Sequence, residues 1–236
     1  MTITPTTLTR AAGVAAAAAG LIFIGVQINH PPMEVASVTT TEWAVRNSAK
    51  VVMAGLALAG LTGMYLRQVR ETGVLGLVGY LLSGVAYLLI TSTSFMAAYA
   101  LPELAGRDPR YVDQVLSVAT GRGSIGDIGI LQTAFTVQNL SYLAAGLVFG
   151  IALYRAGVLA RWAAALLAVG GLVTIALAAM PDAFYRLLAF PNGIAMIGLG
   201  WSLWRTTRTP TPAQPSVTSM PAPRAPAATD SKVSPT

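Results

Sequence analysis

Apolar residues fill six stretches of the chain, and each stretch has about the length of a membrane-spanning helix. At about 1.5 Å per residue, roughly 20 residues cross the ~30 Å hydrocarbon core of a bilayer. Apart from Lys50, charged residues fall outside these stretches. The pattern therefore predicts an all-α integral membrane bundle of six transmembrane helices, at residues 11–28, 49–66, 74–101, 128–154, 162–180 and 187–204.

A polar stripe interrupts the apolar stretch at 128–154. Gln132, Thr136 and Asn139 follow one another at i, i+4 and i+7, so they share one face of the predicted helix. Hydrocarbon cannot form hydrogen bonds with side-chain amides, and this face must therefore meet other helices or a polar cavity. The stripe predicts either interhelical hydrogen bonds or a ligand-lined cavity.

Basic residues divide unevenly between the two sides of the predicted bundle. With six spans both termini share a side, and that side carries nine Lys or Arg and two acids. The other side carries six Lys or Arg and seven acids. The positive-inside rule makes the more basic side cytoplasmic. We therefore expect N-in/C-in topology in a bacterial-type plasma membrane.

This orientation places polar residues of four different spans in the outer half of the bilayer or close to its midplane. Their common depth predicts a pocket that opens outward, or a hydrogen-bonded seam at the same place. Early in the last span, Pro191 predicts a kink or a restarted helix. The candidate pocket residues are Gln27, Ser94, Gln132, Thr136, Asn139 and Asn192.

The connecting segments carry helix-start and helix-stop signals. A hydroxyl and a carboxylate three residues apart, at Thr39 and Glu42, predict a helix start there. The hydroxyl-rich run at 91–94 predicts a bend in the third span, and Pro102 should end that span. Asp108 followed by Pro109 predicts an amphipathic helix, either on the membrane surface or docked on the bundle. The proline-rich segment 206–236 predicts a disordered cytoplasmic tail.

The amino-acid composition excludes several kinds of chemistry. The chain of 236 residues is 54% hydrophobic and 10% charged, contains no cysteine and has His30 as its single histidine. Disulfides, thiolate chemistry and multi-histidine metal sites are thereby excluded, and we expect no cofactor. The net charge of +6 is scattered at the ends of the spans, so it indicates topology rather than nucleic-acid binding. His30, followed by two prolines, is expected in a surface turn.

The segment Leu153-Tyr154-Arg155-Ala156-Gly157, the following Arg161-Trp162 and the run from Pro191 to Trp204 resemble a bacterial family of multi-pass membrane proteins of unknown function. That family often carries an acid in its final span, where this chain has Ala195 or Met196. The resemblance implies a fold and a membrane location. It implies no chemistry.

Two functions fit these observations. The first is a protein, other than an enzyme, that binds or helps to move a small uncharged or lipid-like molecule through the outward pocket. The alternative is a structural subunit that packs on another membrane protein or on a second copy of itself. Small residues spaced four apart, such as Gly55 with Ala59 and Gly146 with Gly150, would form that contact.

Overall fold

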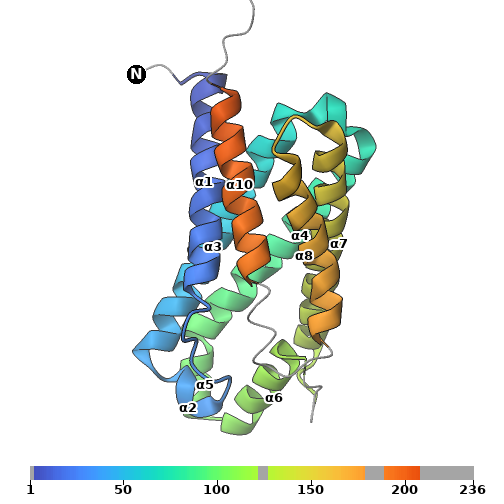
Figure 1. Ribbon diagram of the computed structural model, residues 1–236. Coiled ribbons are helices and arrows are strands. Elements are labelled where there is room, and N and C mark those ends of the chain that lie inside the picture. Colours follow the sequence, from blue (N-terminus) through green and yellow to red (C-terminus); the bar gives the residue numbers. More distant parts are fainter. Residues whose placement is uncertain (1–2, 122–126, 179–188, 208–236) are drawn as a thin grey trace, which may run out of the picture.

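The computed structural model describes residues 3–121, 127–178 and 189–207, which form helices and loops without a strand (Figure 1). Long helices lie parallel or antiparallel to one another, and short helices gather at the end of the molecule away from the N-terminus. The long helices are α1 Pro5–Gly25, α3 Thr41–Arg67, α4 Val69–Tyr99, α7 Ile130–Ala156, α8 Arg161–Ala178 and α10 Ala189–Thr206. The short helices are α2 Val35–Val38, α5 Leu101–Ala105 and α6 Pro109–Ala119.

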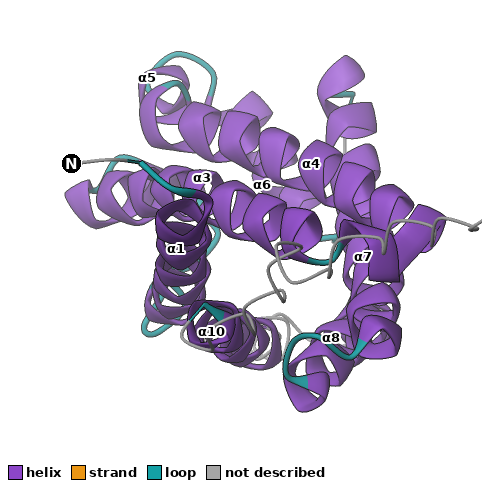
Figure 2. Ribbon diagram, turned by 90° about the horizontal axis from the view of Figure 1, so that it is seen from above, coloured by secondary structure: helices purple, strands orange, loops and turns teal. Residues whose placement is uncertain are grey.

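The six long helices form a closed ring in chain order. α1 packs on α3, α3 on α4, α4 on α7, α7 on α8 and α8 on α10, and α10 returns to α1 (Figure 2). Two buried clusters fill the molecule: one between the long helices, and one between the short helices and the adjoining ends of α3, α4 and α7.

Within the described residues, α1, α3, α4 and α7 are long and apolar enough to cross a membrane. Their mean hydropathy, taken over the most apolar part of each, lies between 1.4 and 2.0. The first four predicted spans fall on these helices. The predicted spans at 162–180 and 187–204 coincide with α8 and α10 but extend partly outside the described residues, and they stay predictions.

The helix start predicted at Thr39 is shifted by one residue, whereas the start predicted at Asp108 is confirmed. The Thr40 side chain accepts a hydrogen bond from the Trp43 N–H at 3.3 Å and begins α3, and Glu42 forms a 2.7 Å ion pair with Arg46 one turn later. Asp108 caps α6 by accepting from the Tyr111 N–H at 3.0 Å. The apolar face of α6 is buried through Val112, Val115 and Leu116, so α6 is docked on the bundle.

The third predicted span differs in detail from the sequence expectation. The break in α4 lies at Gly73, whose φ of 55° suits glycine, and an unbroken helix runs from there through the threonines and serines at 91–94 to Tyr99. Their hydroxyls do bond back to preceding carbonyls, for example Thr91 to Tyr87 at 2.8 Å. These bonds leave the helix continuous because the ladder of main-chain hydrogen bonds remains in place. Pro102 lies in the first turn of α5, just beyond the end of α4.

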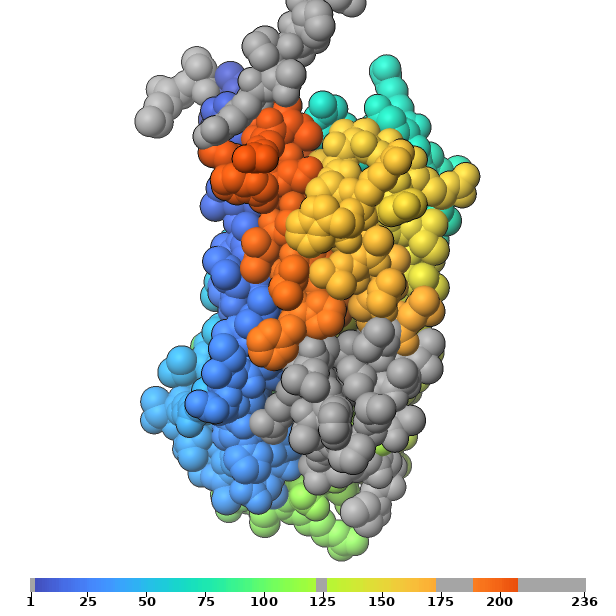
Figure 3. Space-filling view, in the orientation of Figure 1, coloured from blue at the N-terminus to red at the C-terminus, as the bar shows by residue number. Residues whose placement is uncertain are grey.

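Glycines let the ring close. A Cβ at Gly13 of α1 would lie 2.7 Å from the Gly200 carbonyl oxygen of α10, so the two backbones touch. The surfaces of α1 and α10 accordingly run side by side in Figure 3. Gly146 and Gly150 of α7 face α8 of the same chain and meet its backbone. The expectation that these two glycines pack on a partner protein is therefore wrong, because α8 already occupies that face.

We predict that Gly13→Ala lowers the free energy of unfolding by about 1–3 kcal/mol, because the added methyl forces α1 away from α10. Gly55→Ala is the matched control, since no atom lies within 4 Å of a Cβ added there, and it should gain about 0.5–1 kcal/mol from helix propensity. Denaturant unfolding of the purified variants in detergent measures both. Equal stabilities of the two variants would contradict the tight α1–α10 contact.

Candidate ligand cavity

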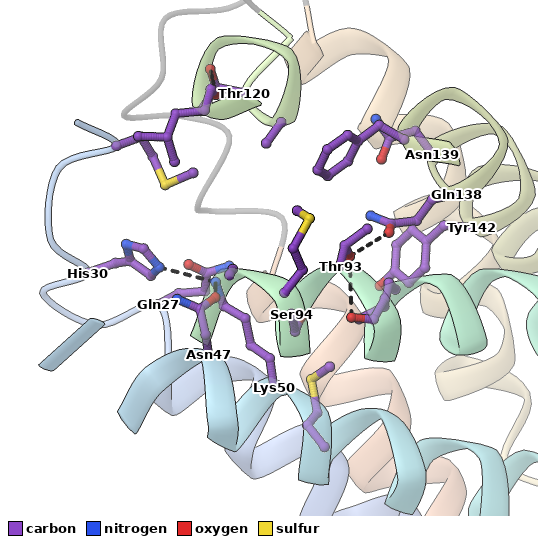
Figure 4. Close-up of a pocket in the computed structure, with 18 of the residues that line it drawn as sticks. Gln27, His30, Asn47, Lys50, Thr93, Ser94, Thr120, Gln138, Asn139 and Tyr142 are labelled. Carbon is purple, nitrogen blue, oxygen red and sulfur yellow. Dashed lines mark hydrogen bonds between the residues drawn. The ribbon is translucent and has the colours of Figure 1, made fainter. Parts of the chain in front are cut away.

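A cavity of about 270 Å³ lies inside the ring, at the end away from the N-terminus (Figure 4). α1, α3, α4, α7 and α10 contribute its walls, and α6 covers it with Val115, Leu116, Ala119 and Thr120. The cavity thus lies between the two buried clusters of the protein.

Most of the cavity wall is apolar and adaptable. Aromatic and aliphatic side chains alternate with methionines, whose unbranched side chains conform to irregular shapes. A wall of this kind accepts an apolar molecular body without selecting one shape. The apolar lining comprises Phe23, Met33, Trp43, Met53, Ile90, Met96, Ala97, Leu101, Val115, Leu116, Ala119, Phe135 and Ala189.

The segment after α1 is anchored to α3, and this anchoring brings His30 to the cavity. Arg46 of α3 donates to the carbonyl oxygens of Val26 at 2.9 Å and Ile28 at 2.8 Å. Asn29 then adopts a left-handed conformation with φ of 50°, which turns the chain. His30 is only 7% exposed and contacts the Trp43 ring edge-on at 5.9 Å. His30 therefore lies in the cavity wall, and the expected surface turn is wrong.

His30, Lys50 and Asn47 form one polar group of the cavity. The His30 Nδ1 lies 2.8 Å from the Pro31 carbonyl oxygen, so it must donate, and Nε2 is left to accept from Lys50 Nζ at 3.2 Å. Lys50 also donates to the Asn47 Oδ1 at 3.2 Å, and the Asn47 amide donates to the Trp43 carbonyl oxygen. This arrangement joins the His30 ring, Lys50 and Asn47 in one chain of hydrogen bonds.

A second polar group joins α4 to α7. Thr93 of α4 donates to the Gln138 Oε1 of α7 at 2.8 Å, and the rings of Tyr87 and Tyr142 meet edge-on at 6.0 Å. Thr93, Gln138, Asn139 and Tyr142 lie together on the side of the cavity opposite His30 (Figure 4). A ligand in the cavity would therefore meet polar groups on both sides and apolar side chains between them.

Asn192 lines the cavity from the first turn of α10. Its side chain is only 4% exposed and packs against Gly170 of α8, where a Cβ would overlap the amide. Asn192 makes no side-chain hydrogen bond to the described part of the chain. With Tyr87 and Tyr142, Asn192 also lines a second void of about 20 Å³ that continues inward. An amide in this position can bond a polar group placed in the cavity.

The structure brings together four of the six predicted site residues. Gln27, Ser94, Asn139 and Asn192 line the cavity. Gln132 and Thr136 are exposed and lie outside its lining, so the prediction is wrong for these two residues. The Thr136 hydroxyl instead donates to the Gln132 carbonyl oxygen of the same helix at 3.0 Å.

The face of α7 that reaches the cavity is rotated from the predicted stripe. Phe135, Gln138, Asn139 and Tyr142 line the cavity at i, i+3, i+4 and i+7. The prediction considered amides and hydroxyls alone, whereas the true face mixes them with aromatic rings. That mixed face, rather than the run of polar residues, is the signal that could have found Gln138.

Sequence reasoning also missed Asn47, Lys50 and Thr93. Asn47 and Lys50 lie three residues apart on α3, a spacing that places them on one face of a helix, and this signal could have linked them to each other. Their contact with His30 depends on the loop after α1, which no local pattern reveals.

The described lining residues supply hydrogen-bonding groups but no carboxylate, and the described residues contain no group of three acids or histidines close enough to hold a metal ion. Such a site can bind and orient a molecule by apolar contact and hydrogen bonds. In comparisons with known proteins, no family model, curated protein or solved structure matches the chain. The resemblance to a multi-pass membrane family stays a prediction.

Proposed function

We propose that the chain is a multi-pass membrane protein that binds, or helps to move, a small uncharged or lipid-like molecule in the cavity beneath α6. The observation that carries this proposal is the combination of a largely apolar cavity of about 270 Å³ with polar groups on two sides. Small-molecule sites in proteins have this character, and this volume lies close to the lower end of their usual range of ~300–1,000 Å³.

The hydrogen bonding of the cavity amides favours a bound ligand over a role limited to joining the helices. Thr93 and Gln138 form an interhelical bond, as expected for residues that join two helices. Asn139 and Asn192 line the same cavity and form no side-chain hydrogen bond within the described residues. Asn192 is only 4% exposed, whereas Asn139 is exposed, so Asn192 in particular gains from a polar group inside the cavity. An amide withdrawn from water without a partner costs about 1–3 kcal/mol.

For the orientation we propose six spans, with both termini in the cytoplasm and the cavity opening outward. Arg67, Arg155, Arg161 and Arg205 lie at helix ends on the same side as the start of α1, away from the cavity. The positive-inside rule assigns that side to the cytoplasm. The segment 206–236, which lies almost wholly outside the described residues, would then form the cytoplasmic tail.

A structural or partner-binding subunit is the second candidate. Gly55 and Ala59 are exposed on α3, and no atom lies within 4 Å of a Cβ added at Gly55. Two small residues on an outward helix face allow close approach of another membrane helix. This face would serve a partner protein or a second copy of the chain, and it leaves the cavity unexplained.

The ligand proposal predicts that a panel of fatty alcohols, fatty amides, phenols and short-chain lipids contains compounds that raise the unfolding temperature of the purified protein. For such a compound, Asn192→Leu should weaken binding by about tenfold, because the ligand loses a buried hydrogen bond. Gln132→Leu removes the same kind of amide outside the cavity and should bind normally. Titration by isothermal calorimetry in detergent measures both variants.

Two outcomes would count against the ligand proposal. A protein that no compound stabilises, but that co-purifies with one stoichiometric membrane partner, would support the subunit candidate. Equal weakening in the Asn192→Leu and Gln132→Leu variants would place the binding site elsewhere.

The orientation predicts opposite labelling of two single-cysteine variants. The chain has no cysteine, so a membrane-impermeant maleimide reports one introduced position at a time. Asp113→Cys, on the exposed face of α6, should react in intact cells, whereas Glu71→Cys, at the start of α4, should react only after permeabilisation. The reverse pattern would invert the topology.

A further inference from the structure

A second hollow lies at the opposite end of the bundle, between α8 and α10. This groove has a volume of about 370 Å³ and is formed by Ala160 and Trp162 at the start of α8 and by Trp201, Ser202 and Arg205 near the end of α10. Arg205 lies about 20 Å along α10 from the cavity residue Asn192, at ~1.5 Å per residue. The groove is therefore separate from the cavity.

The walls of the groove are two outward-facing tryptophans. Trp162 is 59% exposed and its indole lies on Gly198, where any Cβ would overlap the ring. Trp201 is 52% exposed and stacks on Trp204 with ring centroids 5.1 Å apart. Large indoles held in this way at the end of a spanning helix are typical of the membrane interface, where one side of the ring meets acyl chains and the other meets headgroups.

The floor and rim of the groove carry polar groups suited to phosphate. The Ser202 Oγ accepts the Ala160 N–H at 2.9 Å, which fixes the floor and leaves the hydroxyl proton able to donate. Arg205 is exposed, its guanidinium lies 5.0 Å from the Trp201 ring centroid, and it forms no ion pair within the described residues. A planar guanidinium held over an aromatic ring still presents its edge to a phosphate oxygen pair.

The charge at this end of the bundle selects the kind of lipid. Among the described residues, six arginines lie at this end against one acid, Glu71. Such a field attracts a headgroup with net negative charge and repels the trimethylammonium group of a zwitterionic choline lipid. Phosphate alone is common to both lipids, so the surrounding charge decides between them. The arginines are Arg10, Arg67, Arg70, Arg155, Arg161 and Arg205.

We propose that the groove binds an anionic phospholipid of the surrounding bilayer. The phosphate meets Arg205 and Ser202, and the acyl chains follow the indoles of Trp162 and Trp201 towards the membrane interior. This site is independent of the ligand proposed for the cavity beneath α6, and either one can fail without the other.

Tryptophan fluorescence tests this site directly, because two of the chain's four tryptophans line the groove. The full-length protein is placed in vesicles of phosphatidylglycerol and phosphatidylcholine at one fixed ratio, with bromine near the ester bonds of either one lipid or the other. Brominated phosphatidylglycerol should quench more than its share of the mixture predicts. Arg205→Gln should reduce that excess about fivefold, and Arg205→Lys should retain part of it.

Arg70→Gln is the matched control, because it removes one exposed arginine from the same end of the bundle but from α4, away from the groove. It should keep the excess quenching of the unsubstituted protein. Quenching that follows the mixing ratio in the unsubstituted protein would overturn the proposal. So would an equal loss in Arg70→Gln and Arg205→Gln, because the preference would then come from the general charge of the surface.

Discussion

Contact between the backbones of α1 and α10 holds the structure together, because it closes six helices into a ring. Gly13 faces the Gly200 carbonyl oxygen, and about two turns further along α1 Gly20 faces Gly193. In hydrocarbon there is no hydrophobic force between helices, so close van der Waals approach and hydrogen bonds must hold them. A side chain at these positions would open the ring between α1 and α10, the two helices from opposite ends of the chain.

Closure of the ring is also what makes a polar cavity possible within an apolar bundle. Amides facing lipid would stay unsatisfied, at a cost of several kcal/mol each on transfer from water to hydrocarbon. Inside the ring, Asn47, Lys50 and His30 satisfy one another, and Thr93 satisfies Gln138. Gln27, Asn139 and Asn192 also line the cavity, and α6 covers it. Close packing along α1 and α10 thus permits a polar cavity inside the ring.

Much of the helical architecture could be predicted from the sequence, because long apolar runs and caps are local signals. Asp108 begins α6 as predicted, and Thr40 begins α3 one residue after the predicted Thr39. The site was harder to predict because it depends on the rotation of each helix about its axis. Gln132 and Asn139 share a face by spacing, yet the wall of the cavity follows Phe135 and Tyr142 and takes in only Asn139.

The contacts of His30 show a second limit of sequence reasoning. Two prolines after it suggested a surface turn, and nothing nearby in the chain indicates Lys50 as a partner. The contact forms because Arg46 anchors the loop after α1 through two carbonyl oxygens. Such a contact between distant segments depends on the packing of whole helices, which local pattern does not encode.

The most direct test of the cavity is the reactivity of a cysteine placed at its floor. Because the chain has no cysteine of its own, Asn192→Cys and Ala195→Cys can each be treated with N-ethylmaleimide in detergent. Ala195 lies three residues further along α10, is 0% exposed and lies in the packed core. We expect Asn192→Cys to react readily and Ala195→Cys to react only when the protein is unfolded. Equal resistance of the two variants in the folded protein would mean that no accessible cavity exists at Asn192.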